Sequence, residues 1–221
     1  MGEKIEDELA KASERNAFLL KELQHRVRNN LQIMVSLVKL QLTTMLDPSV
    51  RKALLTTQRR MHALCVSNEV SLNRQEGDKL ELYGLMQEIT DSLLDFYDSS
   101  ARDIIIELTG ENIRIMPDFI LPLAMITSEI IANTLEHAQQ RANLIRLDIS
   151  WSAKDDGEVS LMYGDVGGGF PEDVIQRLGE SLGIMLIRTL AEQIHATISI
   201  SNSDRGAITS IDFSSGSPQK K

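Results

Sequence analysis

Apolar residues recur at spacings of three and four along residues 3–46, which is the repeat of one face of an α-helix. The stretch contains neither glycine nor proline. The pattern therefore predicts one continuous helix, roughly 65 Å long at a rise of 1.5 Å per residue. Asp47 and Pro48 predict its end and the start of a second helix, with Asp47 as the N-cap and Pro48 at the first helical position. This second helix is expected to reach about Leu72.

Two helices joined by so short a turn predict an antiparallel hairpin. Both helices carry an apolar stripe, and one hairpin cannot bury both stripes against itself. We therefore expect two copies of the chain to form a homodimer through a four-helix bundle. The hairpin accounts for residues 1–76, and the segment 73–78, with Gly77 as its break, is the predicted linker.

From Lys79 onward the hydrophobic pattern changes to short alternating runs separated by longer helical ones. The fold class predicted for the whole chain is an all-α helical hairpin followed by an α+β sandwich, with the second domain at residues 77–214. Residues 215–221 contain mainly Ser, Gly, Pro and Lys, and they predict a disordered tail. Helices are expected at 80–97, 117–137 and 182–194, and strands at 104–108, 113–115, 144–151, 159–163, 197–201 and 207–213.

Composition narrows the classes of partner. The net charge of -9 and the pI near 5.0 argue against nucleic acid as a partner, because binding to a phosphate backbone needs a basic face. A single cysteine, Cys65, excludes an internal disulfide and fits a reducing compartment. No apolar run approaches the about 20 residues of a membrane span, and no signal-peptide pattern is present. We expect a cytoplasmic chain without direct membrane insertion.

The stretch 20–34 carries the first candidate chemistry. His25 lies just off the apolar stripe, so its imidazole is expected at the solvent edge of the helix. Arg26 is suited to pairing with phosphoryl oxygens, and Asn29, one turn later, to orienting a water molecule or a phosphoryl group. Glu22, one turn earlier, is placed to accept the other ring N–H and fix the tautomer. A charged, solvated helix face with an incidental histidine is the alternative, and this stretch alone does not decide between them.

The second domain contains a polar stripe on an otherwise apolar helix. Glu129, Asn133, Glu136 and His137 fall near one face of the predicted helix 117–137. An asparagine that faces a pocket suits Mg²⁺, which takes one or two protein oxygens and completes its octahedron with phosphates and water. The stripe is equally typical of a helix face that meets solvent.

Two glycine-containing segments complete the candidate nucleotide site. Asp165, Gly167 and Gly169 follow a predicted strand, where a carboxylate can accept a hydrogen bond from the exocyclic amine of adenine and glycines permit close approach of the backbone. Ser181 and Gly183 open a predicted helix whose free amides can hold phosphate. Taken singly, the first segment is also typical of a tight turn and the second of a helix cap.

In this order, the pieces resemble a sensor histidine kinase of the subfamily whose phosphoacceptor motif is His-Arg-x-x-Asn-Asn-Leu-Gln. The resemblance covers the chain from about Leu19 to Phe213. It implies that the hairpin is the dimerisation and histidine-phosphotransfer domain, and that the α+β part is an ATP-binding domain of the GHKL type. In this sequence the motif is His25-Arg26-Val27-Arg28-Asn29-Asn30-Leu31-Gln32.

The resemblance also implies roles for single residues. His25 would be the phosphoacceptor, Asn133 the Mg²⁺ ligand and Asp165 the reader of adenine. Gly167, Gly169 and Gly183 would form the hinges and phosphate-facing turns of a lid, and Glu129 the polar partner one turn before the asparagine. The implied activity is ATP-dependent autophosphorylation of His25, followed by transfer to an aspartate of a response-regulator receiver domain, with Asn29 supporting dephosphorylation of that partner.

The sequence departs from the subfamily pattern at Glu136, where lysine is frequent, at Val166, where asparagine is common, and at Glu180, where a small residue is usual. These departures leave a second function open, a phosphorelay module in which His25 exchanges phosphate between receivers while the second domain no longer uses ATP. A coiled-coil scaffold without chemistry is a more distant alternative.

Overall fold

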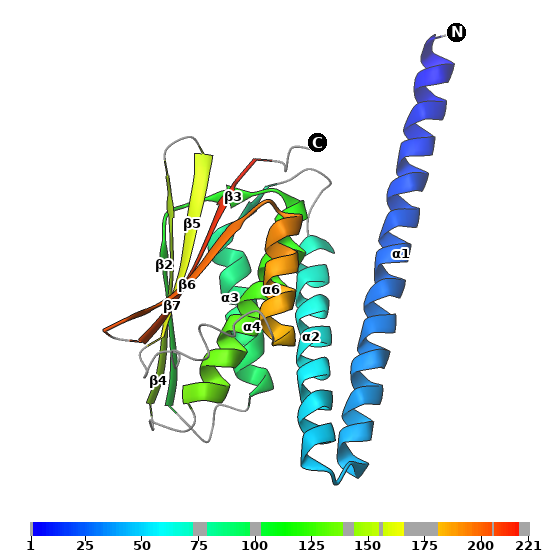
Figure 1. Cartoon of the computed structure of the whole chain (residues 1–221). Coiled ribbons are helices and arrows are strands. Elements are labelled where there is room, and N and C mark those ends of the chain that lie inside the picture. The colour runs from blue at the N-terminus through cyan, green and yellow to red at the C-terminus, as the bar shows by residue number, and fades with distance from the viewer. Residues whose placement is uncertain are drawn as a thin grey trace. The chain divides into compact units, whose positions relative to one another are not determined.

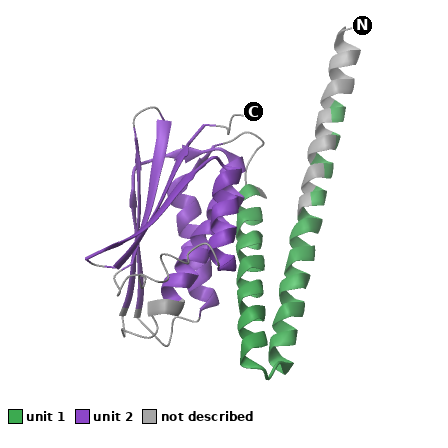
Figure 2. Cartoon of the chain, viewed as in Figure 1, with its two compact units in different colours: residues 1–73 green, residues 74–221 purple. Residues whose placement is uncertain are grey.

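The computed structural model divides the chain into two compact units, residues 1–73 and 74–221 (Figure 2). The predicted boundary at 76/77 and the predicted linker 73–78 lie outside the residues that the structure describes, as does the end of the chain from 217 onward. The structure describes residues 2–72, 79–97, 103–138, 144–154, 157–165, 181–204 and 206–216.

The first unit is a helical hairpin of α1 (Gly2–Thr44) and α2 (Pro48–Leu72), shown in Figure 1. Asp47 Oδ1 accepts hydrogen bonds from the backbone N–H groups of Ser49 at 2.8 Å and Val50 at 3.2 Å, so the predicted N-cap is confirmed. The Ser49 hydroxyl bonds the same oxygen, and this contact, with the two amides, holds the pKa of Asp47 below its ordinary value. Arg51 Nη1 donates to the Leu42 carbonyl oxygen at 2.8 Å and closes the end of α1.

Helix α1 exposes apolar side chains along one side. In a single copy of the chain their exposed fractions range from 42% to 68%, although apolar side chains at helical spacing normally face a partner. Contact with α2 lies elsewhere on the helix, for example at Arg28, whose Nε is 3.7 Å from Glu69 Oε1. The hairpin therefore leaves one stripe of α1 uncovered, made of Phe18, Leu19, Leu23, Val27, Met34 and Leu37.

In its described residues the second unit is a mixed five-stranded sheet with the helices α3 (Leu82–Phe96), α4 (Ile120–Ala138) and α6 (Leu182–Gln193) on one face (Figure 1). The strand order is β2-β4-β5-β7-β6. β2 and β4 are parallel, and every other neighbouring pair is antiparallel. The strands span β2 (Asp103–Gly110), β4 (Leu144–Ala153), β5 (Glu158–Asp165), β6 (Thr197–Ser203) and β7 (Gly206–Ser214).

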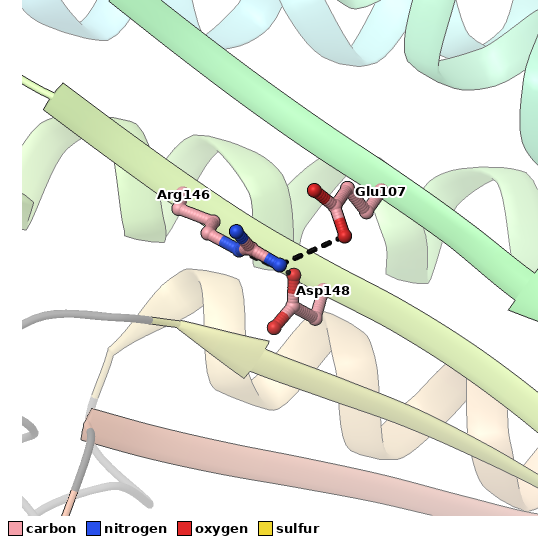
Figure 3. Close-up of polar contacts among 3 residues, drawn as sticks. All are labelled: Glu107, Arg146 and Asp148. Carbon is pink, nitrogen blue, oxygen red and sulfur yellow. Dashed lines mark hydrogen bonds and ion pairs between the residues drawn. The ribbon is translucent and has the colours of Figure 1, made fainter.

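Alternation along β4 places the core. Ile149 and Trp151 are buried under the helices, whereas Arg146 and Asp148 point to the open face of the sheet. There Arg146 Nη2 pairs with Glu107 Oε2 of β2 at 2.8 Å, and Arg146 Nε pairs with Asp148 Oδ1 at 3.0 Å (Figure 3). All three side chains are two-fifths exposed or more, so the contacts help to fix the register of the parallel pair more than they add stability.

The beginning of the second unit differs from the sequence prediction. A helix was expected from Leu80, but Leu80 and Glu81 form the short strand β1 (Leu80–Glu81), which pairs antiparallel with β3 (Arg114–Ile115). The helix begins only at Leu82. The partner strand lies more than thirty residues away in sequence, so helical periodicity gave no signal of it.

Helix α4 is the central core element. After one 3₁₀ turn, η2 (Pro117–Phe119), it runs beneath the sheet with almost all of its apolar side chains buried. In the described part of the chain, residues 117–135 are the one helical stretch long and apolar enough to cross a membrane, but 83% of that window is buried inside the domain. Its apolar character is therefore explained by its position in the core.

One glycine of the sheet is required by its neighbour. A Cβ atom on Gly110, the last residue of β2, would lie 2.2 Å from Cε2 of the Trp151 indole. That indole is 4% exposed, donates from Nε1 to the Glu111 carbonyl oxygen at 2.8 Å, and meets the Tyr83 ring edge-on. Glycine thus lets the strand pass directly against the indole.

Candidate functional site

The candidate phosphoacceptor lies on the exposed surface of α1. His25 is exposed, as predicted from its place beside the apolar stripe, and Asn29, one turn later, is exposed as well. Arg26 Nε forms an ion pair with Glu22 Oε1 at 2.9 Å, across one helical turn. The Arg26 side chain is 74% exposed and the Glu22 side chain 49%, so the pair is weak and readily exchanged.

This pairing bears on two predicted roles. One oxygen of Glu22 is engaged with Arg26, and the predicted contact of Glu22 with the His25 ring stays a prediction. Arg26 lies beside His25 in the sequence, on an exposed helix surface where a phosphoryl oxygen can compete for its guanidinium. The second unit contains the other predicted site residues.

A narrow pocket opens between α4, α6 and the inner face of the sheet. Its volume is about 20 Å³, enough for one water molecule. Two of the predicted residues line it: Asn133 from α4 and Asp165 from the end of β5. The other lining residues are the apolar Ile130, Leu147, Ile184, Ile187, Ile200 and Ala207 and the polar Thr134, Tyr163 and Thr209.

Asp165 is held in place by the neighbouring strand. Its Oδ1 atom accepts a hydrogen bond from the backbone N–H of Ala207, the second residue of β7, at 2.6 Å. Alternation along β5 turns Asp165 to the same side of the sheet as the buried Tyr163, which is the side that carries α4. A carboxylate fixed at the edge of an apolar slot can accept a hydrogen bond from an amine of a flat ring bound there.

The remaining predicted residues lie around this pocket or outside the described part of the chain. Glu129, one turn before Asn133, is buried and does not line the pocket. Ser181 is the N-cap of α6 and accepts from the Ile184 N–H at 3.3 Å, and Gly183 lies in the first turn of that helix. The predicted residues outside the description are Gly167, Gly169 and the side chain of His137, and so are Val166, Glu180 and the side chain of Glu136.

The chemistry of the residues present suits a nucleotide with its metal ion. Asp165 offers an acceptor for adenine, and the five isoleucine and leucine side chains of the pocket offer apolar faces for its ring. Among the described residues no cluster of three or more His, Cys, Asp or Glu side chains could hold a metal by itself. A single protein ligand such as Asn133 is sufficient for Mg²⁺ when phosphate oxygens and water supply the other ligands.

Sequence reasoning missed three polar residues of the pocket, Thr134, Tyr163 and Thr209. The period-two pattern of β5 contained a signal for Tyr163, since it falls two positions before Asp165 and therefore on the same face. Thr209 lies opposite Tyr163 on β7, and this cross-strand register could not be read from the sequence.

Comparisons with protein families match both units. A family model described as "Histidine kinase" matches residues 22–97, and one described as "Histidine kinase-, DNA gyrase B-, and HSP90-like ATPase" matches residues 120–216. The first match includes His25, and the second includes Asn133 and Asp165. The two matches do not overlap.

Individual relatives agree with these matches. The chain is 28% identical over 178 residues to "Sensor histidine kinase PdtaS" of Mycobacterium tuberculosis, a match to 77% of this chain and 34% of that protein. It is 23% identical over 198 residues to "Blue-light-activated histidine kinase 2" of Erythrobacter litoralis, which covers 88% of this chain and 56% of the relative. The chain thus spans from a third to just over half of the length of these relatives.

A solved structure shares the fold. The histidine kinase domain of a blue-light activated histidine kinase from Erythrobacter litoralis superposes with a TM-score of 0.61 at 22% identity, covering 88% of this chain and 92% of that domain. The predicted fold class, a helical hairpin followed by a GHKL-type α+β domain, is confirmed.

Proposed function

Because this chain belongs to the histidine kinase family, we propose that it uses ATP to phosphorylate its own His25 and then passes the phosphoryl group to an aspartate of a response-regulator receiver domain. The observation that carries the proposal is the pocket in which Asn133 and Asp165 come together, in the same chain as an exposed histidine within a His-Arg-x-x-Asn-Asn motif.

Each candidate site residue has a separate role in the proposed phosphorylation of His25. In the proposed reaction a nitrogen of His25 forms a bond to the γ-phosphorus as the bond to the ADP oxygen breaks, and the exposed imidazole releases its N–H proton to solvent. ATP supplies the phosphoryl group, and Mg²⁺ bound with it neutralises charge on the phosphates. Asp165 and the apolar pocket hold the base, Asn133 contributes a metal ligand, and Arg26 leaves Glu22 to pair with the phosphoryl oxygens on His25.

The second half of the reaction needs a partner. Phosphorylated His25 lies on an exposed helix surface, where a receiver domain can place its aspartate within reach. Transfer would form an acyl phosphate and return the imidazole to its starting form. Asn29, exposed one turn away, would orient the water that later hydrolyses the partner's acyl phosphate.

We further propose that the chain acts as a homodimer. The uncovered stripe of α1 is apolar over several turns, and a second copy of the hairpin would bury it in a four-helix bundle. Light scattering coupled to size-exclusion chromatography should give the mass of two chains. Leu37→Glu, at an exposed position of the stripe, should shift it toward one chain, whereas Lys39→Glu, an exposed charge two positions away, should not. A monomeric wild type would contradict the bundle.

A cytoplasmic location is part of the proposal. ATP and receiver domains are available there, and the single Cys65 needs no oxidising compartment. The test is fractionation of cells that express the chain at natural level, and recovery from an oxidising compartment would contradict it.

The decisive experiment is incubation of the purified chain with Mg²⁺ and γ-labelled ATP. Label that is released by acid and retained in alkali is expected on the wild type and absent from His25→Asn. The matched control is His195→Asn, because His195 is also exposed and asparagine tolerates its positive φ of 53°. This control should retain the label.

A second variant tests the pocket independently. Asn133→Ala should abolish the label and weaken binding of Mg²⁺-ATP, whereas His25→Asn should bind Mg²⁺-ATP like the wild type. Label on His25→Asn would contradict the assignment of the phosphoacceptor. Failure of the folded wild type to bind ATP at all would contradict the kinase proposal and favour a module that exchanges phosphate between receivers.

A further inference from the structure

Tyr163 bridges the sheet and the helix layer at one end of the nucleotide pocket, through contact with Thr127. Its side chain leaves β5 on the inner face, is 1% exposed, and brings its hydroxyl oxygen to 2.6 Å from Thr127 Oγ1 on α4. Thr127 Oγ1 in turn donates to Met86 Sδ of α3 at 3.7 Å. One tyrosine thus connects a strand and two helices.

The donors in the series of contacts from Tyr163 through Thr127 to Met86 can be assigned, because the sulfur of Met86 can only accept. Thr127 can use its own O–H toward Met86 only if Tyr163 donates the hydrogen bond between the two hydroxyls. Both groups then have a partner, and the phenol ring is fixed in one orientation. Burial raises the pKa of Tyr163 far above its ordinary value against a smaller opposing effect of Thr127, so the ring stays neutral at any physiological pH.

The pocket lies on one side of this bridge between Tyr163 and Thr127. Along α4 it is lined by Ile130 and Asn133, which follow Thr127 by one and two turns, and along β5 it is lined by Asp165, two residues after Tyr163. From the Tyr163–Thr127 bridge, α4 and β5 therefore run in the same direction along the pocket. Successive inward positions of β5 are about 7 Å apart. The base-reading carboxylate and the closed end of the pocket are separated by no more than that distance along the strand.

We propose that Tyr163 is a specificity-determining residue that sets the depth of the pocket and restricts it to purines without a substituent on the exocyclic amine. The inference rests on the proposed function, because it takes Asp165 as the acceptor for that amine. A group attached to the amine would point past Asp165 toward the ring of Tyr163. Packing holds that ring in place, since Tyr163 is 1% exposed and Thr209 occupies the opposite position on β7.

The test compares binding of ATP with binding of N6-benzyl-ATP by calorimetry, with Mg²⁺, to the full chain. The wild type should bind N6-benzyl-ATP at least about tenfold more weakly than ATP. Tyr163→Ala, which opens the end of the pocket, should bind N6-benzyl-ATP at least about tenfold more tightly than the wild type does. Tyr163→Phe is the matched control: it keeps the ring, loses only the hydroxyl, and should retain the wild-type preference within about threefold.

The outcomes separate this inference from the proposed function. Wild-type binding of ATP with an equal affinity for N6-benzyl-ATP, or an unchanged preference in Tyr163→Ala, would overturn the role of Tyr163 and leave the kinase proposal standing. No binding of ATP by the folded wild type would overturn both. Tyr163→Leu serves where the alanine variant does not fold, as judged by circular dichroism, because it still fills part of the core and should change the preference in the same direction.

Discussion

Replacing Gly110 with alanine tests how closely β2 passes the Trp151 indole. The added Cβ would lie 2.2 Å, 2.3 Å and 2.4 Å from three atoms of that ring, where non-bonded carbon atoms normally keep about 3.5–4.0 Å. The indole must therefore move by about 1 Å or more. It is buried, so its displacement meets packed side chains and also breaks its hydrogen bond to the Glu111 carbonyl.

The expected cost is the sum of two effects less one gain. Overpacking of a core site costs about 1–3 kcal/mol, and loss of the indole hydrogen bond about 0.5–1.5 kcal/mol. Alanine also restricts the unfolded chain, which stabilises the folded state by about 0.4–1 kcal/mol where the backbone accepts it. Gly110→Ala should therefore lower the free energy of unfolding of the second unit by about 2.5 kcal/mol.

The chain provides a convenient assay, because Trp151 is its single tryptophan. Urea unfolding followed by tryptophan fluorescence reports on the second unit, and circular dichroism at the same urea concentrations follows the whole chain. Gly84→Ala is the matched control. A Cβ at Gly84 meets nothing within 4 Å, and the residue lies in the first turn of α3, so this variant should be neutral or up to about 1 kcal/mol more stable.

A double-mutant cycle isolates the contact. In a Trp151→Leu background the indole is gone, so unfolding is followed by circular dichroism in all four variants, and Gly110→Ala should cost at least about 1 kcal/mol less than it does in the wild type. A loss below about 0.5 kcal/mol in the wild-type background, or the same loss in both backgrounds, would refute the reasoning.

Three further predictions concern single side chains. Asp165→Asn keeps an acceptor for the Ala207 N–H but presents an amide N–H toward adenine, so ATP affinity should fall by at least about tenfold with little change in the melting temperature, while Asp165→Ala should lower both; equal melting temperatures in the two variants would contradict a structural role. The raised pKa of Tyr163 predicts that stability falls as pH rises above about 10, because the unfolded state then releases a proton that the folded state keeps. Tyr163→Phe should lack this part of the alkaline loss, and parallel urea midpoints between about pH 8 and 10.5 would contradict it. Asp47→Ala removes the acceptor of the Ser49 and Val50 amides and should lower the thermal midpoint of the hairpin at neutral pH. Because the pKa of Asp47 is lowered in the folded state, its contribution is present above the ordinary carboxyl pKa and disappears as pH falls below it, so wild type and Asp47→Ala should converge in acid.

Local features were the ones that the sequence predicted well. Asp47 and Pro48 mark a helix start through contacts within three residues, and the structure has that cap. The strand Leu80–Glu81 was missed because its partner is distant in the chain, and the ion pair of Glu22 with Arg26 was missed although its i,i+4 spacing was readable.

The site was predicted in its parts but not in its assembly. Asn133 and Asp165 were singled out from motifs, and the structure brings them to one pocket. The hydrogen bond of Asp165 with the Ala207 amide and that between Tyr163 and Thr127 depend on strand register and on the approach of α4 to the sheet. Neither can be derived from periodicity, which tells which face a side chain occupies but not what it meets there.

The parallel pairing of β2 with β4 has a consequence for how the second unit folds. Antiparallel neighbours can close through a short turn, but a parallel pair requires a long crossover, and here that crossover contains α4. The chain must thus close a long loop before the helix that bears Asn133 can settle against the sheet. We expect the pocket to be among the last parts of the unit to form during refolding. A bound nucleotide, which favours the folded state by mass action, would then act chiefly by slowing unfolding, with little effect on the rate of refolding.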